Sequence, residues 1–378
     1  MERRRIVFLT GTRADFGKIK SLIARIEAHS DFEAFLFVTG MHLMHTYGYT
    51  MIEVERCNFK NVHAFENHTS ETTMELTLAK TISGFSAYIK EIKPDMIVVH
   101  GDRVEALAGA IVGSLSNILV AHIEGGEISG TIDELIRHAT SKMSHIHYVS
   151  HNKAEQRLLQ MGELPEAVFV IGSPDIDIMF SQDLPTMDAV RKHYEISFES
   201  YGIVLFHPVT TESESMHTYA KAFVDGLLAS DRNFVVIYPN NDLGSKAILE
   251  AYSAFEGRSN FRVFPSIRFE YFLTLLKAAD FIIGNSSAGI REAPYYGVPT
   301  LNIGARQLNR AEHDHIIDLP YDVAAIAAAL KSELPQIPES KPVFGNGKSH
   351  DLFIQSLESE ALWQIDHQKQ FNDSYEQA

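Results

Sequence analysis

Two short apolar runs in the first half of the chain constrain the fold most, because each ends abruptly in charged and glycine-rich sequence. Met96 to Val99 leads into His100-Gly-Asp-Arg103, and Ile118 to Ile123 leads into Glu124-Gly-Gly-Glu127. Such runs are typical of parallel strands, and ligands of open α/β sheets bind beyond the carboxyl ends of the strands. We therefore expect Asp102 and Glu124 at one edge of a parallel sheet. Asp133 follows at the start of the next helix, so three carboxylates are predicted to converge.

These carboxylates have two interpretations. Acidic groups that lie close together raise each other's pKa, so a set can divide into ionised and protonated members and supply both a base and an acid. Alternatively, Asp102 caps a helix that begins near Val104, and Asp133 caps a helix that begins near Ile132 or interacts with its dipole. The spacing alone leaves both interpretations open.

Length and charge limit the class of protein. A chain of 378 residues is too long for one simple core and predicts two α/β domains of similar size. The formal net charge of -16 argues against a nucleic-acid partner. The single cysteine, Cys57, excludes an internal disulfide and fits a reducing compartment.

The apolar run Ile6 to Leu9 is shorter than the roughly seven residues of a secretory signal. No uncharged stretch approaches the roughly 18 residues of a membrane span, so we expect a cytoplasmic protein with no membrane partner.

Strands and helices are predicted to alternate along both halves of the chain. In the first half we expect strands at Ile6–Leu9, Phe35–Val38 and Val168–Ile171, a loop at Gly11–Gly17, and helices at Lys18–Ala28 and about Met74–Ile92. In the second half we expect strands at Gly202–Phe206, Phe234–Tyr238, Phe281–Ile283 and Thr300–Ile303, and Thr300–Ile303 is expected to be the last strand. Helices are expected from about Met216 and over Leu352–Phe371. The domain boundary is predicted after Ser173-Pro-Asp175.

A second cluster of polar residues lies at Gly284–Gly289, which runs from a strand into a helix. Backbone N–H groups at a helix N-terminus, with small residues that allow close approach, form an anion site suited to a diphosphate. Ser286 and Ser287 would add hydroxyl donors, and Glu292 could accept from ribose hydroxyls. The structural alternative is that Asn285 or Ser286 caps the helix and Glu292 complements its dipole.

Two histidine-containing segments could carry chemistry. His207 directly follows an apolar strand and could donate to a phosphate or a leaving group, although a histidine at a strand end is more often structural. His313-Asp-His315 lacks an HExxH pattern and a third ligand at a telling spacing. We therefore assign no metal site.

Taken together, these motifs resemble the UDP-N-acetylglucosamine 2-epimerases over nearly the whole chain. The matching segments are Thr10-Gly-Thr-Arg-Ala-Asp-Phe-Gly17, His100-Gly-Asp-Arg103, His122-Ile-Glu-Gly-Gly-Glu-Ile-Ser-Gly-Thr-Ile-Asp133, His207-Pro-Val-Thr-Thr211, Pro239-Asn-Asn-Asp242, Gly284-Asn-Ser-Ser-Ala-Gly289 with Glu292, and Arg306. Met41, Arg103 and Glu124-Gly-Gly-Glu127 stand where the non-hydrolysing branch usually has Gln, Thr and a Glu-Ala-Gly-Leu-Arg run. These departures favour the hydrolysing branch.

The resemblance implies two Rossmann-like domains in a glycosyltransferase-B-like fold, with the active site in the interdomain cleft. Residues 1–172 would carry the carboxylates, residues 173–354 would bind UDP, and a helix over 355–378 would return to the first domain. It implies catalytic roles for Asp102, Glu124, Asp133 and His207. It also implies contacts to the UDP-sugar from Arg13, Arg103, Asn240, Ser286, Ser287, Glu292 and Arg306. One contact of the first loop is in question, because several relatives have serine where this chain has Gly17.

The implied reaction is hydrolysis of UDP-N-acetylglucosamine with inversion at C2, without a metal or other cofactor, in a homodimer or homotetramer. The 4-acetamido-6-deoxy analogue, UDP-N,N'-diacetylbacillosamine, remains an alternative substrate. Two other functions would use the same nucleotide site. A glycosyltransferase of this fold would need an acceptor for the sugar. A non-catalytic UDP-sugar sensor would bind its ligand normally after an Asp102→Asn substitution and would have no turnover to lose. A metallophosphoesterase is disfavoured because its Asp-x-His and Gly-Asn-His motifs are missing.

Overall fold

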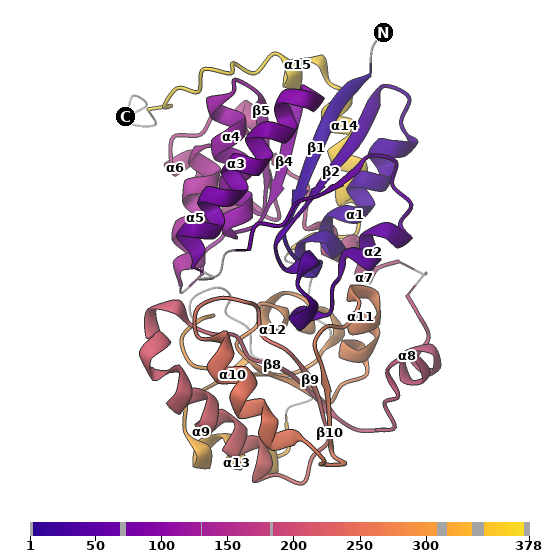
Figure 1. The fold of residues 1–378 in the computed structure, drawn as a ribbon, viewed down its shortest axis with the longest axis vertical. Coiled ribbons are helices and arrows are strands. Elements are labelled where there is room, and N and C mark those ends of the chain that lie inside the picture. Colours follow the sequence, from indigo (N-terminus) through magenta and orange to yellow (C-terminus); the bar gives the residue numbers. More distant parts are fainter. Residues whose placement is uncertain are drawn as a thin grey trace. The chain divides into compact units, whose positions relative to one another are not determined.

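The computed structural model describes residues 3–68, 73–129, 131–181, 184–307, 316–334 and 344–373. The chain forms two compact units. Unit 1 comprises Met1–Glu127, Asp133–Ser181 and Val343–Ala378, and unit 2 comprises Ile128–Ile132 and Gln182–Pro342. Each unit is an α/β domain built on its own sheet (Figure 1).

Unit 1 contains a seven-stranded parallel sheet in the order β3-β2-β1-β4-β5-β6-β7. Its strands are β1 (Arg4–Thr10), β2 (Phe32–Val38), β3 (Val62–Ala64), β4 (Met96–His100), β5 (Leu119–Ile123), β6 (Ile146–Val149) and β7 (Val168–Val170). The strand order reverses direction between β1 and β4. In doubly wound sheets this reversal marks the place where ligands bind, at the carboxyl ends of the strands.

Helices pack on both faces of this sheet. They are α1 (Arg13–Ala28), α2 (Met51–Arg56), α3 (Met74–Ile92), α4 (Val104–Leu115), α5 (Ile132–Lys142), α6 (Asn152–Gln160), α7 (Pro174–Met179), α14 (Ser349–Glu358) and α15 (Glu360–Trp363). The last two come from the end of the chain, after unit 2, and are yellow in Figure 1. They contribute Phe353, Leu357 and Leu362 to the core of unit 1.

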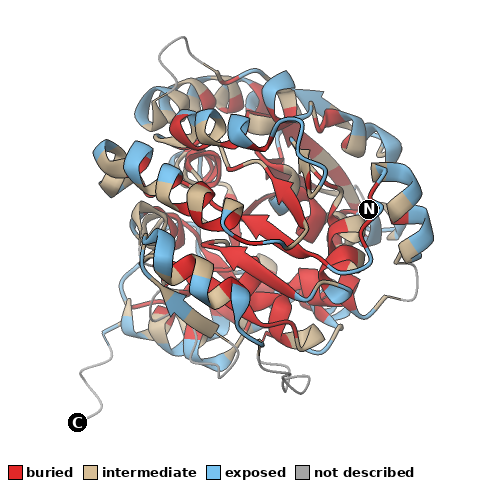
Figure 2. Cartoon of the chain, turned by 90° about the horizontal axis from the view of Figure 1, so that it is seen from below, coloured by how far each residue is buried: buried red, intermediate tan, exposed pale blue. Residues whose placement is uncertain are grey.

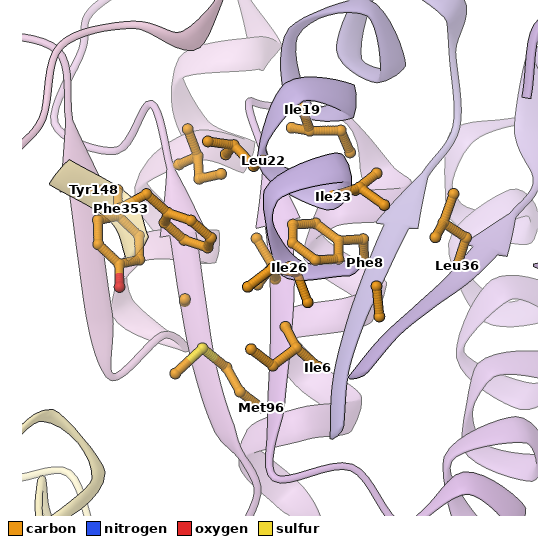
Figure 3. Close-up of a cluster of buried hydrophobic side chains, with 14 of the residues drawn as sticks. Ile6, Phe8, Ile19, Leu22, Ile23, Ile26, Leu36, Met96, Tyr148 and Phe353 are labelled. Carbon is orange, nitrogen blue, oxygen red and sulfur yellow. The ribbon is translucent and has the colours of Figure 1, made fainter. Parts of the chain in front are cut away.

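Alternation along β1 explains the two-sided core of unit 1. Ile6 and Phe8 point to the face covered by α1 and α14 (Figure 3), whereas Val7 and Leu9 pack against α3 and α4. Successive side chains of a strand point to opposite faces, so a sheet covered on both faces has nearly continuous apolar strands. Figure 2 colours the chain by burial and shows strands in red and helices with exposed stretches in pale blue.

The first helix begins earlier than the sequence predicted. Residues 11–17 were expected to form a loop, but α1 begins at Arg13, and Gly17 is buried within it. The reason is a capping box: the Thr12 side chain accepts the N–H of Asp15, and the Asp15 carboxylate accepts the N–H of Thr12. This reciprocal pair satisfies two backbone donors that a helix start leaves open.

Unit 2 contains a six-stranded parallel sheet in the order β10-β9-β8-β11-β12-β13. The strands are β8 (Gly202–Leu205), β9 (Phe234–Ile237), β10 (Phe261–Phe264), β11 (Phe281–Gly284), β12 (Thr300–Ile303) and β13 (Ile316–Leu319). The helices are α8 (Met187–Tyr194), α9 (Met216–Leu228), α10 (Ser245–Tyr252), α11 (Phe269–Lys277), α12 (Ala288–Arg291) and α13 (Val323–Lys331). The order reverses between β8 and β11. The prediction that Thr300–Ile303 is the last strand was wrong, because β13 pairs with its outer side.

The α/β class with two Rossmann-like domains is therefore confirmed by two parallel sheets with the same pattern of strand order. Among the helices of the described residues, none combines the length and the apolar character that crossing a bilayer requires.

Candidate functional site

Asp102 and Glu124 lie at the same edge of the unit 1 sheet, as the sequence predicted. Strands β4 and β5 are paired in parallel with His100 opposite Ile123, so Asp102 lies two residues and Glu124 one residue beyond this last pair. The N–H of Gly101 donates to the carbonyl of Ile123 at 2.9 Å, which keeps the two loops together.

Asp102 does not cap helix α4. The N-cap is Arg103, which makes no side-chain cap hydrogen bond, and the Asp102 carboxylate instead accepts from the guanidinium of Arg137. Arg137 is fully buried in α5, one turn after Asp133. The structural interpretation of Asp102 as a helix cap was therefore wrong.

Arg137 relates all three predicted carboxylates electrostatically. Burial alone would lower the pKa of Arg137, but the negative charges of Asp102, Glu127, Glu124 and Asp133 outweigh it and hold this pKa above its ordinary value. The sequence analysis missed Arg137, although its spacing of four residues from Asp133 places both on one face of a helix. Asp102 thus contacts this buried cation, and the charges of the other two predicted carboxylates also act on it.

Glu124 belongs to a second buried network in unit 1. Its Oε1 lies 3.0 Å from the Lys18 Nζ, and the same ammonium lies 3.4 Å from Oδ2 of the fully buried Asp175. His100 Nε2 lies 3.5 Å from the same Glu124 oxygen. Lys18 lies on α1 and Asp175 on α7, so their pairing with Glu124 depends on tertiary structure that the sequence analysis did not foresee.

The backbone of Glu124 is also unusual. Its φ of +68° lies in the left-handed region, which costs a non-glycine residue about 1–2 kcal/mol. Residues held in such conformations cluster at functional sites, where the surrounding contacts enforce them. The ion pair with Lys18 and the hydrogen bond from the Glu124 N–H to the Tyr148 carbonyl, at 3.0 Å, are two such contacts.

His122 fixes the loop that carries Asp102. Its Nε2 donates to the carbonyl of Gly101 at 2.7 Å, and its Nδ1 accepts the hydroxyl of Ser141 at 2.9 Å. Burial lowers the pKa of His122 to about 3, so the ring is neutral at physiological pH. A neutral ring with both nitrogens bonded to protein holds the β4 loop against α5.

The two arginines predicted in unit 1 lie at helix starts. Arg13 is the first residue of α1 and is half-buried. Arg103 is also half-buried, and its Nε lies 3.5 Å from Oε2 of the buried Glu105. Both arginines follow strands that flank the reversal of strand order, β1 and β4.

In unit 2, His207 and Asn240 meet at the ends of β8 and β9. The N–H of Asn240 donates to Nδ1 of His207 at 3.0 Å. Asn285, at the end of β11, bonds the backbone of His207 through both ends of its amide. His207 therefore lies beside the point where the strand order of unit 2 reverses.

The segment Gly284–Gly289, predicted to bind a diphosphate, is followed by a shorter helix than we expected. Ser286 and Ser287 are half-buried and precede α12, but this helix has only 4 residues, and Glu292 is its C-cap. Asn285 does not cap α12, and Ser286 accepts the N–H of Ala288 at 3.3 Å. One turn of helix has little macrodipole, so any anion here would be held mainly by individual N–H and hydroxyl groups.

Arg306 lies in the loop after β12 and is half-buried. Its guanidinium donates to the carbonyl of Asn285 at 3.2 Å, which brings it to the same strand ends as His207. Glu292 is almost fully buried. The structure thus brings His207, Asn240 and Arg306 together around Asn285, which the sequence analysis considered only as a helix cap.

Within the described ranges, no group of three or more His, Cys, Asp or Glu side chains is arranged to hold a metal ion. The segment His313-Asp-His315 lies outside the described residues.

Residues 24–358 match the family described as UDP-N-acetylglucosamine 2-epimerase. The UDP-N-acetylglucosamine 2-epimerase of Neisseria meningitidis serogroup B is 48% identical over 375 residues, which covers 98% of this chain and 99% of the relative. The UDP-N,N'-diacetylbacillosamine 2-epimerase (hydrolyzing) of Legionella pneumophila is 32% identical, covering 94% and 96%.

A solved structure shows the same fold. The UDP-GlcNAc 2-epimerase of Methanocaldococcus jannaschii, crystallised with UDP-GlcNAc and UDP, has a TM-score of 0.80 and 22% identity, covering 93% of this chain and 99% of that one. With a family match over most of its length and a relative nearly half identical from end to end, this chain belongs to the UDP-N-acetylglucosamine 2-epimerase family.

Proposed function

We propose that this enzyme is a hydrolysing UDP-N-acetylglucosamine 2-epimerase that releases UDP and N-acetylmannosamine for sialic-acid-type sugar synthesis in the cytoplasm. The observation that carries the proposal is the contact of Asp102 with the buried Arg137, on which the charges of Glu124 and Asp133 also act, in a chain 48% identical to an enzyme of that name. Asp102 binds Arg137 directly. A binding protein for UDP-sugars would have no use for this cluster of acids and bases.

The first step breaks two bonds, C2–H and C1–O, and forms two, the O–H bond on the carboxylate and the second bond between C1 and C2. A carboxylate takes the proton from C2, the C1–O bond to UDP breaks with its electrons going to the diphosphate, and a C1=C2 double bond remains. Glu124 suits the role of base, because the Lys18 ammonium at 3.0 Å favours its ionised form. General base catalysis of this kind typically contributes about 10²–10⁴-fold to the rate.

The second step adds water across the double bond. The water oxygen bonds to C1, its proton passes to a base, and a proton is delivered to C2 on the face opposite to the one it left. Proton transfer on both faces requires more than one carboxylate, because one side chain cannot reach both sides of the ring. We assign Asp102 and Asp133, whose charges both act on Arg137, to this step.

We propose that unit 2 binds the nucleotide. Ser286 and Ser287 would donate to the diphosphate, Glu292 would accept from the ribose, and Asn240 and His207 would lie along the pyrophosphate. Arg306 would supply positive charge from unit 2, and Arg13 and Arg103 from unit 1. Preorganised donors of this kind stabilise the charge that develops on a departing diphosphate. The hydrogen bonds among His207, Asn240, Asn285 and Arg306 support this assignment.

The proposal is tested by incubating the protein with UDP-N-acetylglucosamine alone in D₂O and following the products by NMR. We expect UDP and N-acetylmannosamine carrying deuterium at C2, with no acceptor or added metal needed. UDP-N-acetylmannosamine as the accumulating product would contradict hydrolysis, and an absence of any turnover would contradict the epimerase assignment.

A second substrate is favoured by one comparison. The Legionella relative named for UDP-N,N'-diacetylbacillosamine is 32% identical. We rank UDP-N-acetylglucosamine first because the identity to the Neisseria enzyme is higher, at 48%. Parallel NMR reactions with both nucleotides, compared by kcat/KM, decide between them. We also propose a homodimer or homotetramer, which sedimentation velocity tests.

A further inference from the structure

We propose that Asn285 is a positioning residue that holds His207 as a neutral hydrogen-bond donor for the departing diphosphate. This inference deepens the proposed function and rests on it. Asn285 is fully buried and directly follows β11, whereas His207 lies two residues beyond the end of β8. These two strands are neighbours in the sheet and flank the reversal of strand order in unit 2.

The side-chain amide of Asn285 forms hydrogen bonds with both the backbone N–H and the backbone carbonyl of His207. The N–H of His207 donates to Asn285 Oδ1 at 2.6 Å, and Asn285 Nδ2 donates to the His207 carbonyl at 2.9 Å. The preceding Gly284 permits this approach: it has a φ of +138°, and a Cβ there would lie 2.0 Å from the carbonyl oxygen of Leu205. The pair of bonds fixes the position of His207 relative to β11.

The ring of His207 is then oriented by Asn240. The backbone N–H of Asn240 donates to Nδ1 of His207 at 3.0 Å, so Nδ1 carries a lone pair and the proton of the neutral ring lies on Nε2. Protonation of Nδ1 would set its proton against the N–H of Asn240. The arrangement therefore favours a neutral ring that donates from Nε2 and disfavours an imidazolium.

Asn285 also anchors a third strand end. Its carbonyl accepts from the Arg306 guanidinium at 3.2 Å and from the Gln307 amide at 3.0 Å. One buried residue thus sets the loops after β8, β11 and β12 in a single hydrogen-bonded unit. The donor at His207 Nε2 and the guanidinium of Arg306 are thereby held in fixed positions. Neither has to reorganise as negative charge develops on the departing diphosphate.

The variant Asn285→Ala removes both amide bonds to His207 and keeps the backbone carbonyl that Arg306 uses. We expect kcat to fall by roughly 10²-fold, the size seen when one donor to a developing anion is lost, with a smaller change in KM. Asn285→Asp keeps the acceptor for the His207 N–H but loses the donor to its carbonyl, so its kcat should lie between those of the wild type and the alanine variant.

Asn302→Ala is the matched control. Asn302 is equally inaccessible, lies on the neighbouring strand β12, and donates to Asp318 Oδ1 at 2.7 Å without contacting His207. Its kcat should stay within about twofold of the wild type. If both alanine variants lose kcat equally, Asn285 is only a structural residue and the inference is overturned.

Imidazole ¹⁵N NMR of the UDP-bound protein provides a readout that does not depend on turnover. We expect His207 to be protonated on Nε2 in the wild type and to become a mixture of tautomers in Asn285→Ala. His207→Gln, which can place an N–H₂ near the Nε2 position, should retain more kcat than His207→Asn. A wild-type ring protonated on Nδ1, or a tautomer unchanged in Asn285→Ala, would refute the inference. If the wild type binds UDP but does not turn over UDP-N-acetylglucosamine, the proposed function fails while the tautomer experiment still decides the role of Asn285.

Discussion

The polar clusters at the two sheets use opposite kinds of chemistry. In unit 1, ionised side chains in buried or half-buried positions compensate one another: the half-buried Asp102 binds the buried Arg137, and Lys18 is shared by Glu124 and Asp175. In unit 2, the side chains of His207 and Asn285 and the backbone of Asn240 are held by hydrogen bonds that involve the backbone, and a cation beside them, Arg306, donates to the Asn285 carbonyl.

The difference separates two tasks that the proposed reaction requires. Proton transfer at carbon needs groups whose charge can change, and buried ion pairs determine which member is ionised. Holding a diphosphate as it leaves needs donors that stay in place, and neutral groups tied to the backbone do so without a desolvated charge of their own. Four experiments would break or sharpen this comparison.

The largest effect is expected for Asp102→Asn. The substitution removes one of the proposed proton-transferring groups and leaves Arg137 with a neutral partner, so kcat should fall by about 10²–10⁴-fold. Affinity for UDP, measured by calorimetry, should change little, because the proposed nucleotide contacts lie mainly in unit 2. A loss of UDP affinity as large as the loss of kcat would contradict the division of tasks.

The next largest effect is expected for Lys18→Met. Two buried carboxylates would lose their shared cation, and breaking a buried pair in this way typically costs about 3–5 kcal/mol of stability. The loss of the ammonium also favours the protonated form of Glu124, so the acidic limb of the kcat/KM profile should move to higher pH. Lys20→Met, on the same helix, is the control, because Lys20 is half-buried and the charges of Cys57 and Glu53 act on it. Matching pH profiles for the two variants would exclude the proposed role of Lys18.

Acid should destabilise unit 1 before unit 2. Burial lowers the pKa of His42 to about 4 and that of His122 to about 3, so below the ordinary value of 6.5 the unfolded state binds protons that the folded state does not. Their contribution to stability is therefore lost as the pH falls from about 6.5 toward 4 and 3.

Glu163 extends this loss to lower pH. Burial alone would raise its pKa, but the hydrogen bonds from His147 and Lys142 and the charge of Lys369 hold it at about 2, below the ordinary 4.5. Its contribution is present above pH 4.5 and is lost as the pH falls toward 2. In unit 2, burial raises the pKa values of Tyr201, Tyr252, Tyr296 and Tyr321, and these groups do not titrate in acid. Hydrogen exchange corrected for intrinsic rates, between pH 7 and 4, should show β4 and β5 opening before β8 and β11; the reverse order would refute the prediction.

The smallest effect is expected for Ser286→Ala and Ser287→Ala. Each would remove one neutral hydrogen bond to the diphosphate, worth about 0.5–1.5 kcal/mol, so affinity for UDP should weaken by roughly 2- to 10-fold at nearly unchanged kcat. The control is Ser253→Ala, whose exposed hydroxyl donates only to the Glu250 carbonyl among its described contacts. Unchanged UDP affinity in both serine variants would remove these residues from the nucleotide site.

Local sequence signals predicted much of the fold. The helix expected over about Met74–Ile92 has those bounds, and the carboxylates after β4 and β5 lie at one edge because parallel strands end together. The start of α1 was misplaced because Asp15 was assigned to a loop, although its spacing from Thr12 forms a capping box.

The partners of the predicted residues were harder to foresee. Lys18 reaches Glu124 across 106 positions of sequence, and Asn285 reaches His207 across 78. A single sequence carries no periodicity that links such pairs, since they meet only after the strands have taken their order in the sheet. Arg137 is an exception to this rule, because its spacing of four residues from Asp133 on one helix face can be read from the sequence. Its complete burial cannot be read from the sequence.

The return of the chain to unit 1 has a consequence for the order of synthesis. Phe353, Leu357 and Leu362 complete the hydrophobic face beneath α1, yet they leave the ribosome only after every strand of unit 2 has been made. Unit 2 can thus fold while unit 1 still exposes part of its hydrophobic core to solvent. A nascent chain arrested before Phe353 should accordingly recruit chaperones through the segment that was translated first.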